Sequence, residues 1–287
     1  MAIGADGYNR GEPTLLQCEI EIGVSTPFTV LHMSDTHLTL VDERDNERKH
    51  ELAEKRGQYF PESEATLELA SARAGELGAP ILHTGDLIDF VSHGNLARAE
   101  RFVSENDVFH AAGNHEFSQY VGEAFEDEAY RNQSLPLVQA VFRNDIRFSC
   151  REICGVNFVA IDNSYYHIER AQLDALKAVV SEGKPIVLMM HTPLYTPALF
   201  EKSGKGGKRA AYLLSVPEER MAYYEEKRVI QQKADALTVE ATRYIEEEPA
   251  IRCLLAGHLH FCYNDTVADR LPQYVTGTGV VREIVFS

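Results

Sequence analysis

The sequence has no long apolar run, and this absence excludes the simplest kind of membrane protein. No stretch reaches the roughly 18 consecutive apolar residues that a membrane-spanning helix needs. The opening residues MAIGADGYNRGEPTLLQ have neither a basic start nor an apolar centre, which argues against a secretory signal. Cysteine is also scarce, and the 5 cysteines are odd in number and dispersed along the chain. We therefore expect reduced thiols in a cytoplasmic protein that has no membrane partner.

Basic residues are few for a chain of this length. The sequence contains 28 lysines and arginines against 44 aspartates and glutamates, which gives a formal net charge of −16. A field of that sign repels polyanions, so we expect no nucleic-acid partner. A small phosphorylated substrate remains compatible with it, because bound divalent cations can dominate the local potential. The sequence indicates no particular oligomeric state.

The rest of the composition is that of an ordinary folded protein. Hydrophobic residues make up 44% and charged residues 25% of the 287 positions, enough for a substantial core. Short apolar runs alternate with helical patterns, which predicts one α/β domain over residues 1–287 with helices covering the sheet faces. Strands are expected at 15–22, 27–34, 79–84, 108–112, 146–150, 156–162, 185–191, 251–256 and 280–286. Helices are expected at 62–77, 94–105, 169–182 and 217–247, and the highly charged segment 42–62 as a solvated helix or loop.

The region around 196–248 is predicted to form a cap-like insertion. Its helix, 217–247, has a clear start, because Ser215 and Glu218 have the spacing of a capping box. Residues 196–216 are rich in glycine and lysine but lack the order of a phosphate-binding P-loop. Two interpretations stay open for this stretch, a flexible exposed loop or a mobile lid. The residues that a lid would offer to a substrate phosphate are Lys202, Lys205, Lys208 and Arg209, and Tyr195, which follows His191, is a separate candidate for substrate binding.

Polar side chains suited to metal binding follow five of the predicted strands. The five stretches are MSDTHL, HTGDLID, AAGNHEF, LMMHTP and LAGHLHF, and three have a glycine just before the ligand, where the backbone must turn closely. Ligands of α/β proteins bind outside the carboxyl ends of strands, so we expect these stretches to converge. The groups that they bring are Asp35, His37, Asp86, Asn114, His191, His258 and His260.

The number and chemistry of these groups predict a pair of metal ions. A carboxylate at the end of a buried strand, such as Asp35, is costly unless a cation accompanies it. Seven ligands are too many for one four-coordinate ion, but they suit two ions about 3.5–4 Å apart that share a carboxylate. A nitrogen and oxygen set without thiolate favours Mn, Fe, Zn or Co over Cu(I), Mg or Ca. We therefore expect two divalent transition-metal ions as cofactors.

The same residues form a known series of motifs. In order, the chain contains D-x-H, G-D-x-x-D, G-N-H-E, a single H and G-H-x-H between residues 34 and 260. This series resembles that of the calcineurin-like metallophosphoesterase superfamily, whose motifs have the same order. The resemblance implies a four-layer α/β fold, in which two mixed β-sheets pack as a sandwich flanked by helices. It also implies an enzyme that hydrolyses phosphoric esters.

The resemblance further implies a role for each position. The ligands of the first ion would be Asp35, His37, Asp86 and His260. The ligands of the second ion would be Asp86, Asn114, His191 and His258. Asp86 would bridge the ions, and a metal-bridging hydroxide would attack the phosphorus. His115 would be catalytic, either stabilising the phosphoryl transition state or protonating the leaving oxygen.

Neighbouring residues are expected to support these groups. Asp89 most plainly fits a hydrogen-bond acceptor that orients a ligand. Glu116 stands where the family often has aspartate, and we expect this change to be harmless. Tyr165 and Tyr166 are expected to pack in the core, with stacking against a substrate as the alternative.

Several functions stay open at this point. The first is metal-dependent hydrolysis of a phosphomono- or phosphodiester, and a cap that narrows access slightly favours a small-molecule phosphodiester. A protein Ser/Thr phosphatase or a phosphomonoesterase is the alternative within this class. A non-catalytic binding protein on the same fold is a second possibility, and a metallohydrolase acting on another bond is a third. The complete ligand set favours the first, since a binding protein has no need to keep it.

Overall fold

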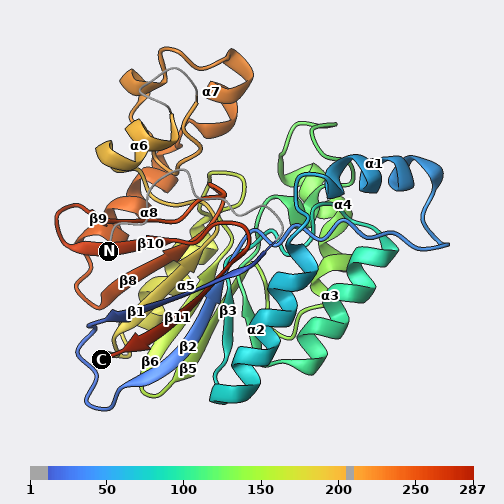
Figure 1. Ribbon diagram of the computed structural model, residues 1–287. Helices are drawn as coiled ribbons and strands as arrows, with labels where there is room; N and C mark the ends of the chain where they lie inside the picture. Colours follow the sequence, from blue (N-terminus) through green and yellow to red (C-terminus); the bar gives the residue numbers. More distant parts are fainter. Residues whose placement is uncertain (1–11, 205–209) are drawn as a thin grey trace.

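Two β-sheets form the centre of the structure, a computed structural model that describes residues 12–204 and 210–287 (Figure 1). The first sheet has the strand order β1–β11–β2–β3–β4, and the second has the order β5–β6–β7–β8–β10–β9. The strands are β1 (Thr14–Ile20), β2 (Phe28–Met33), β3 (Ile81–His83), β4 (Val108–His110), β5 (Phe148–Ile153), β6 (Val156–Ile161), β7 (Ile186–Met190), β8 (Ile251–Ala256), β9 (Tyr263–Val267), β10 (Leu271–Val275) and β11 (Val280–Phe286). The α-helices are α1 (Glu47–Gly57), α2 (Ser63–Leu77), α3 (His93–Glu105), α4 (Glu128–Gln139), α5 (Arg170–Val180), α6 (Pro197–Ser203), α7 (Glu226–Gln232) and α8 (Ala236–Glu247). Two 3₁₀ turns are η1 (His115–Phe117) and η2 (Glu218–Met221).

Parallel pairing brings the ends of several strands to one edge of each sheet. β2, β3 and β4 run parallel to one another in the first sheet. β6, β7 and β8 do the same in the second sheet. Both sheets also contain antiparallel pairs, β11 with β2 and β10 with β9, so both are mixed, as predicted. Parallel strands place their carboxyl ends side by side, which explains why residues from distant parts of the sequence meet there.

Apolar side chains fill the three interfaces between the layers of helices and sheets. Between the sheets, Val30, Leu82, Phe158 and Leu255 belong to one buried cluster. The outer face of the first sheet packs against α2, α3 and α4, and that of the second packs against α5 and α8. The predicted sandwich of two mixed sheets flanked by helices is therefore confirmed. No helix within residues 12–204 and 210–287 is long and apolar enough to cross a bilayer.

The predicted helix 217–247 is wrong as a single element. The chain instead forms η2, α7 and α8, and Lys233 leaves the helical region with ψ at 113°. The Asp235 side chain then accepts a hydrogen bond from Thr238 N and starts α8 as its N-cap. Ser215 has φ at 57° and its hydroxyl pairs with Thr242, so the predicted capping box does not form. The Asp235 cap therefore starts a new helix, although apolar residues continue at helical spacing through the break.

Four further elements differ from the prediction. α4, β9 and β10 were not expected, and α6 lies in a stretch predicted as a loop. Thr196 explains α6, because its hydroxyl accepts from Leu199 N and Pro197 occupies the first turn. β10 gave a weak signal because it contains proline and glutamine, yet it pairs with β8 inside the sheet. The charged segment 42–62 contains α1, a helix with Lys49 and Ala53 buried.

Candidate metal centre and active site

The carboxyl ends of five strands bring the predicted ligands together. The first sheet contributes the segments that follow β2, β3 and β4, and the second contributes those that follow β7 and β8. Three groups of side chains place their ligand atoms within 4.8 Å of one another. These groups are Asp35 with His37 and His260, Asp86 with His191 and His258, and His37 with Asp86 and His115. The sequence-predicted residues therefore converge on one place.

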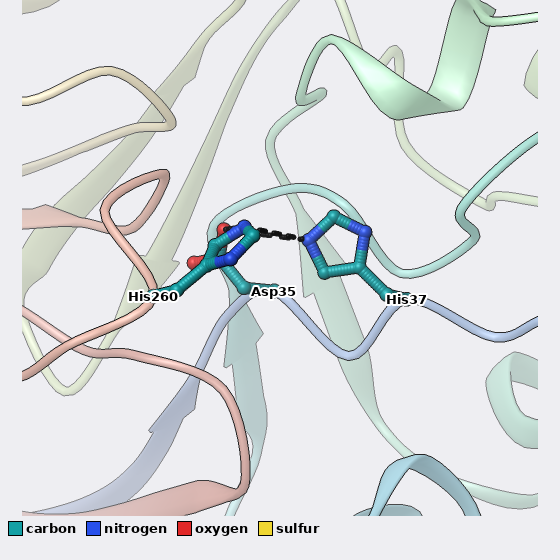
Figure 2. A group of neighbouring side chains, drawn as sticks. All are labelled: Asp35, His37 and His260. Atoms are coloured by element: carbon teal, nitrogen blue, oxygen red, sulfur yellow. Dashed lines mark hydrogen bonds and ion pairs between the residues drawn. The ribbon is translucent and has the colours of Figure 1, made fainter. Parts of the chain in front are cut away.

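The first group joins two segments that are far apart in the sequence (Figure 2). The imidazoles of His37 and His260 face each other with their Nε2 atoms 3.0 Å apart. Asp35 Oδ1 lies 3.8 Å from His37 Nε2 and 3.6 Å from His260 Nε2. Two nitrogens bound to one tetrahedral ion are roughly 3.3 Å apart. The three side chains therefore have the spacing of ligands to a common cation.

The second group lies beside the first and shares a carboxylate with it. His191 Nε2 is 3.0 Å from His258 Nδ1 and 3.1 Å from Asp86 Oδ2. The same oxygen of Asp86 is 3.7 Å from His37 Nε2 in the first group. Asp86 Oδ1 instead accepts a hydrogen bond from His115 N at 2.8 Å, which fixes the direction of Oδ2. Asp86 thus stands between two sets of imidazoles.

Asn114 supplies a direct test of whether these residues fit a metal ion. Its Oδ1 is buried and has no hydrogen-bond partner among the described residues. Its Nδ2 donates to Glu126 Oε1 at 3.4 Å, so the amide is turned with the oxygen away from that carboxylate. A buried carbonyl oxygen without a partner is costly, and a cation supplies the missing partner. The orphaned oxygen and the neighbouring imidazoles form a donor set that fits a divalent transition metal.

Backbone conformation at the ligands is unusual. Five of them have positive φ: Asp35 (53°), His37 (51°), Asp86 (57°), His258 (72°) and His260 (57°). Such conformations cost free energy in residues other than glycine, and they cluster at functional sites. The two i, i+2 pairs therefore do not extend as strands but turn sharply past the strand ends. This turn points each pair toward the common centre.

Glycines let the ligand loops approach one another. A Cβ on Gly85 would lie 2.6 Å from both Gly113 N and His191 Nδ1. A Cβ on Gly257 would lie 2.6 Å from Asp35 Oδ2 and would collide with Ser34. Only glycine leaves room for these contacts, which explains the glycine before the ligand in three of the motifs.

Three of the four imidazoles in these two groups are held through their other nitrogen. His37 Nδ1 lies 2.9 Å from Asp89 Oδ1, and His191 Nδ1 lies 2.7 Å from the carbonyl oxygen of Thr84. His258 Nε2 lies 2.8 Å from the hydroxyl of Tyr166. Partners of this kind set the tautomer and the orientation of a ligand imidazole. The hydroxyl of Tyr166 therefore has a role that sequence reasoning missed.

Asp89 connects the first group to His115. Besides His37, its Oδ1 lies 3.2 Å from His115 Nδ1, and its main-chain oxygen lies 2.7 Å from the same nitrogen. Arg56 also binds this carboxylate. Its Nε donates to Asp89 Oδ2 at 2.6 Å, and its Nη2 donates to Asp89 Oδ1 at 2.7 Å. Because Nδ1 of His115 is occupied, its Nε2 is the nitrogen left for a substrate. No local sequence signal marks Arg56, which lies in the charged segment.

Glu116 ties two ligand loops together. Its carboxylate accepts hydrogen bonds from Asp86 N at 2.7 Å, Leu87 N at 2.6 Å and Gly113 N at 2.7 Å. The side chain is completely buried. Glutamate at this position is therefore a structural clamp on the loop that carries Asp86.

The electrostatics of the site keep its carboxylates ionised. Burial alone would raise the pKa of Asp35, but the hydrogen bond with His37 and the charges of neighbouring histidines outweigh it and lower the pKa to about 2. Burial would likewise lower the pKa of His115, but the charge of Asp86 and the hydrogen bonds of Asp89 raise it to about 10. The pKa of His191 is raised to about 9, against the effect of burial, mainly by the charge of Asp86. Without metal, protonated His115 and His191 thus lie beside ionised Asp35 and Asp86, whereas burial lowers the pKa of His258 and His260.

A pocket of about 320 Å³ opens over these groups. Asp86, Asn114, His115, His258 and His260 line it from the two sheets. Tyr166, Tyr212, Lys227, Arg228 and Gln231 also line it. Of the residues predicted to meet a substrate, Tyr195 is absent from this lining, and its ring packs against Phe200 with centroids 5.8 Å apart. Lys205 and Arg209 lie outside the described residues.

Comparisons with known proteins show what the chain is similar to. The family model for calcineurin-like phosphoesterases matches residues 28–262. No curated protein matches the chain. Among solved structures, a dimetal phosphatase from Danio rerio is 14% identical with a TM-score of 0.49, and the alignment covers 88% of each chain. Phosphopantetheinyl hydrolase from Mycobacterium tuberculosis is 12% identical with a TM-score of 0.45, over 94% of this chain and 91% of that one.

A third solved structure is longer than this chain. The 5′-nucleotidase from Candida albicans is 12% identical with a TM-score of 0.43, and the alignment covers 93% of this chain. It covers 47% of the nucleotidase, so this chain spans about half the length of that protein. The family match, by contrast, extends over most of this chain and includes all five motifs. The chain therefore belongs to the calcineurin-like phosphoesterase family and is a metal-dependent hydrolase of phosphoric ester bonds.

Proposed function

We propose that this enzyme hydrolyses a small-molecule phosphoester at a centre of two divalent transition-metal ions, Mn, Fe or Zn. The residues that would hold one ion are Asp35, His37, Asp86 and His260. Those that would hold the other are Asp86, Asn114, His191 and His258. When bound, two such cations supply an activated water and neutralise charge on the phosphate oxygens. The position of Asp86 Oδ2, between His37 Nε2 and His191 Nε2, is the observation that carries the proposal.

His115 would act on the leaving oxygen. Its Nδ1 is held by Asp89, and it lines the pocket. The interactions of Nδ1 with Asp89 favour the protonated imidazole, which can donate its other proton from Nε2. Asp89 keeps the ring oriented and stabilises its charged form. The role of His115 is thus general acid catalysis at the departing alcohol.

The size of the pocket supports a small substrate. Its volume of about 320 Å³ is at the lower end of the range for sites that bind small molecules. The net charge of −16 disfavours nucleic acid. Residues of α7 and Tyr212 line the pocket, which supports a cap formed by the region 196–248. The five free cysteines suit a reducing cytoplasm.

Hydrolysis of two chromogenic esters tests the proposal. Protein stripped with EDTA and reloaded with Mn²⁺ should hydrolyse bis(p-nitrophenyl) phosphate or p-nitrophenyl phosphate. The Asp86→Asn variant, which keeps the side-chain size, should lose this activity. We expect the diester to be turned over at least as well as the monoester, and the ratio of the two rates assigns the ester class. Two bound ions without turnover of either ester would favour a binding protein on the same fold.

A further inference from the structure

The pocket over the metal ligands has a positively charged wall. Lys227 and Arg228, both on α7, line it together with the ring of Tyr212. In Figure 1, α7 lies in the orange segment that projects beyond the sheets. The whole chain has a net charge of −16, so two cations at one pocket contrast with the rest of the protein. The metal ions and His115 account for the scissile phosphate, but they leave these two cations without a role.

Arg228 is held in a fixed position without a carboxylate partner. Its guanidinium lies over the ring of Tyr212, 4.7 Å from the centroid. It donates one hydrogen bond, to Gln231 Oε1, and in the described part of the chain no carboxylate forms an ion pair with it. Arg220, on η2 of the same region, instead pairs with Glu201 at 3.4 Å. The remaining N–H groups of Arg228 are therefore available to a ligand.

A chain of hydrogen bonds connects Arg228 to the metal centre. Gln231 accepts from Arg228 and donates to Glu126. Glu126 accepts in turn from Nδ2 of Asn114, whose Oδ1 faces the proposed ion. Each oxygen of Glu126 thus accepts one of these bonds, and Glu126 forms no ion pair with Arg228 in the described part of the chain. These hydrogen bonds position the guanidinium relative to the metal ligands before any substrate binds.

We propose that Arg228, assisted by Lys227, binds a second anionic group of the substrate. This inference rests on the proposed function and names its substrate class: a phosphoester whose alcohol portion carries a further phosphate or carboxylate. The planar guanidinium suits either group, because it binds both with two parallel hydrogen bonds. Tyr212 buries one face of the guanidinium and strengthens its interaction with an anion by excluding water. The cap then discriminates among substrates, and the residues at the strand ends carry out the hydrolysis.

Two matched pairs of substrates test this proposal. The first pair is glycerol 3-phosphate and 3-phosphoglycerate, which differ by a carboxylate. The second pair is the p-nitrophenyl ester of thymidine 5′-phosphate with and without a 3′-phosphate, which differ by a second phosphate on a diester. In at least one pair, kcat/KM of the Mn²⁺-loaded enzyme should be about 10- to 100-fold higher for the member with the second anion, the effect expected of a charged hydrogen bond.

Variants of the cap separate the subsite from the fold. Arg228→Met should remove most of this preference, because KM rises for the member with the second anion much more than for its partner, and the ratio within each pair cancels any general change in turnover. Arg228→Lys should retain part of the preference, since the charge remains but the fork of donors is lost. Arg220→Met is the matched control, because its guanidinium pairs with Glu201 and it is not among the lining residues. Thermal unfolding of all three variants confirms that they fold.

The outcomes distinguish this inference from the proposed function. Turnover of p-nitrophenyl phosphate without a preference in either pair would overturn the anion subsite alone. A preference that survives Arg228→Met unchanged would also overturn it. Failure of the metal-loaded enzyme on every one of these esters would overturn the proposed function and this inference with it. The pair that shows the preference identifies the second group as carboxylate or phosphate.

Discussion

The guanidinium of Arg56 binds the carboxylate of Asp89 through two hydrogen bonds, at 2.6 and 2.7 Å. Oδ1 of this carboxylate, one of the two oxygens that Arg56 binds, also contacts His37 and His115. Arg56 lies on α1, a helix that the sequence suggests is a solvated addition. Through Asp89, it orients both a metal-facing imidazole and the imidazole proposed to act on the leaving group. The contact gives a surface helix a part in the chemistry.

Replacing Arg56 should slow catalysis more than it weakens substrate binding. Arg56→Met leaves Asp89 buried without its cation, so His37 and His115 lose part of their orientation. We expect kcat to fall about 10- to 100-fold, the usual effect of removing such a partner, with KM for p-nitrophenyl phosphate nearly unchanged. Arg56→Lys should recover part of kcat. Arg48→Met on the same helix is the control, because Arg48 pairs at the surface with Glu123, and an equal loss in that variant would contradict the account.

Glu116→Gln should destabilise the fold. Both carboxylate oxygens accept main-chain N–H groups, and the amide of glutamine replaces one oxygen with a donor that faces another donor. A buried polar group left unpaired costs about 1–3 kcal/mol in the free energy of unfolding. Urea denaturation of the metal-free protein measures this loss. A Glu116→Gln variant as stable as the wild type would show that the clamp contributes little.

Tyr166→Phe should weaken the second metal position. The change removes only the hydroxyl that lies 2.8 Å from His258 Nε2. Loss of such a partner lowers metal affinity by about 10- to 100-fold. Calorimetric titration of the metal-free variant with Mn²⁺ should show one site with weakened affinity and one site with near wild-type affinity. Two unaffected sites would mean that Tyr166 only packs, as the sequence suggests.

The metal-free protein should lose stability as the pH rises. The pKa values of His115 and His191 are about 10 and about 9 in the folded chain, against roughly 6.5 for an unfolded histidine. Their contribution is therefore fully present below about pH 6.5 and disappears as the pH rises through 9 to 10. Urea denaturation at pH 6.5 and 9.5 should show a decrease in the free energy of unfolding of about 1–3 kcal/mol per histidine.

Two single variants isolate this effect from other titrating groups. His115→Gln and His191→Gln should each show a smaller decrease than the wild type between the same pH values. His191 must also lose its proton to bind metal, so metal binding near neutral pH should release protons. An identical pH dependence in wild type and both variants would contradict the assigned protonation states.

The sequence predicts well which polar side chains meet at the strand ends, because the signal for each lies in its neighbouring residues. Each candidate ligand lies within four residues of the end of a strand, and a carboxylate or imidazole at such a place has few structural explanations. The two-sheet sandwich is predictable for a similar reason, since central strands such as β6 and β7 are mainly apolar runs. The fold and the convergence of these side chains are thus predictable from the sequence.

The supporting contacts are not predictable in this way. Arg56 and Asp89 are 33 positions apart, and only the path of α1 brings them together. Arg228 approaches the pocket because the expected long helix breaks at Lys233, a break that a single capping aspartate decides. An apolar stripe continues through both α7 and α8, so periodicity alone favours one helix. Long-range polar contacts and competing caps are therefore the part that only the structure supplies.

The central claim is that Asp86 bridges two ions, and anomalous X-ray diffraction at the manganese edge tests it most directly. Crystals of the Mn²⁺-loaded protein should show two anomalous peaks about 3.5–4 Å apart, on either side of Asp86 Oδ2. One peak should lie among Asp35, His37 and His260, and the other near His191 and His258. A single peak, or two peaks that do not share Asp86, would contradict the account.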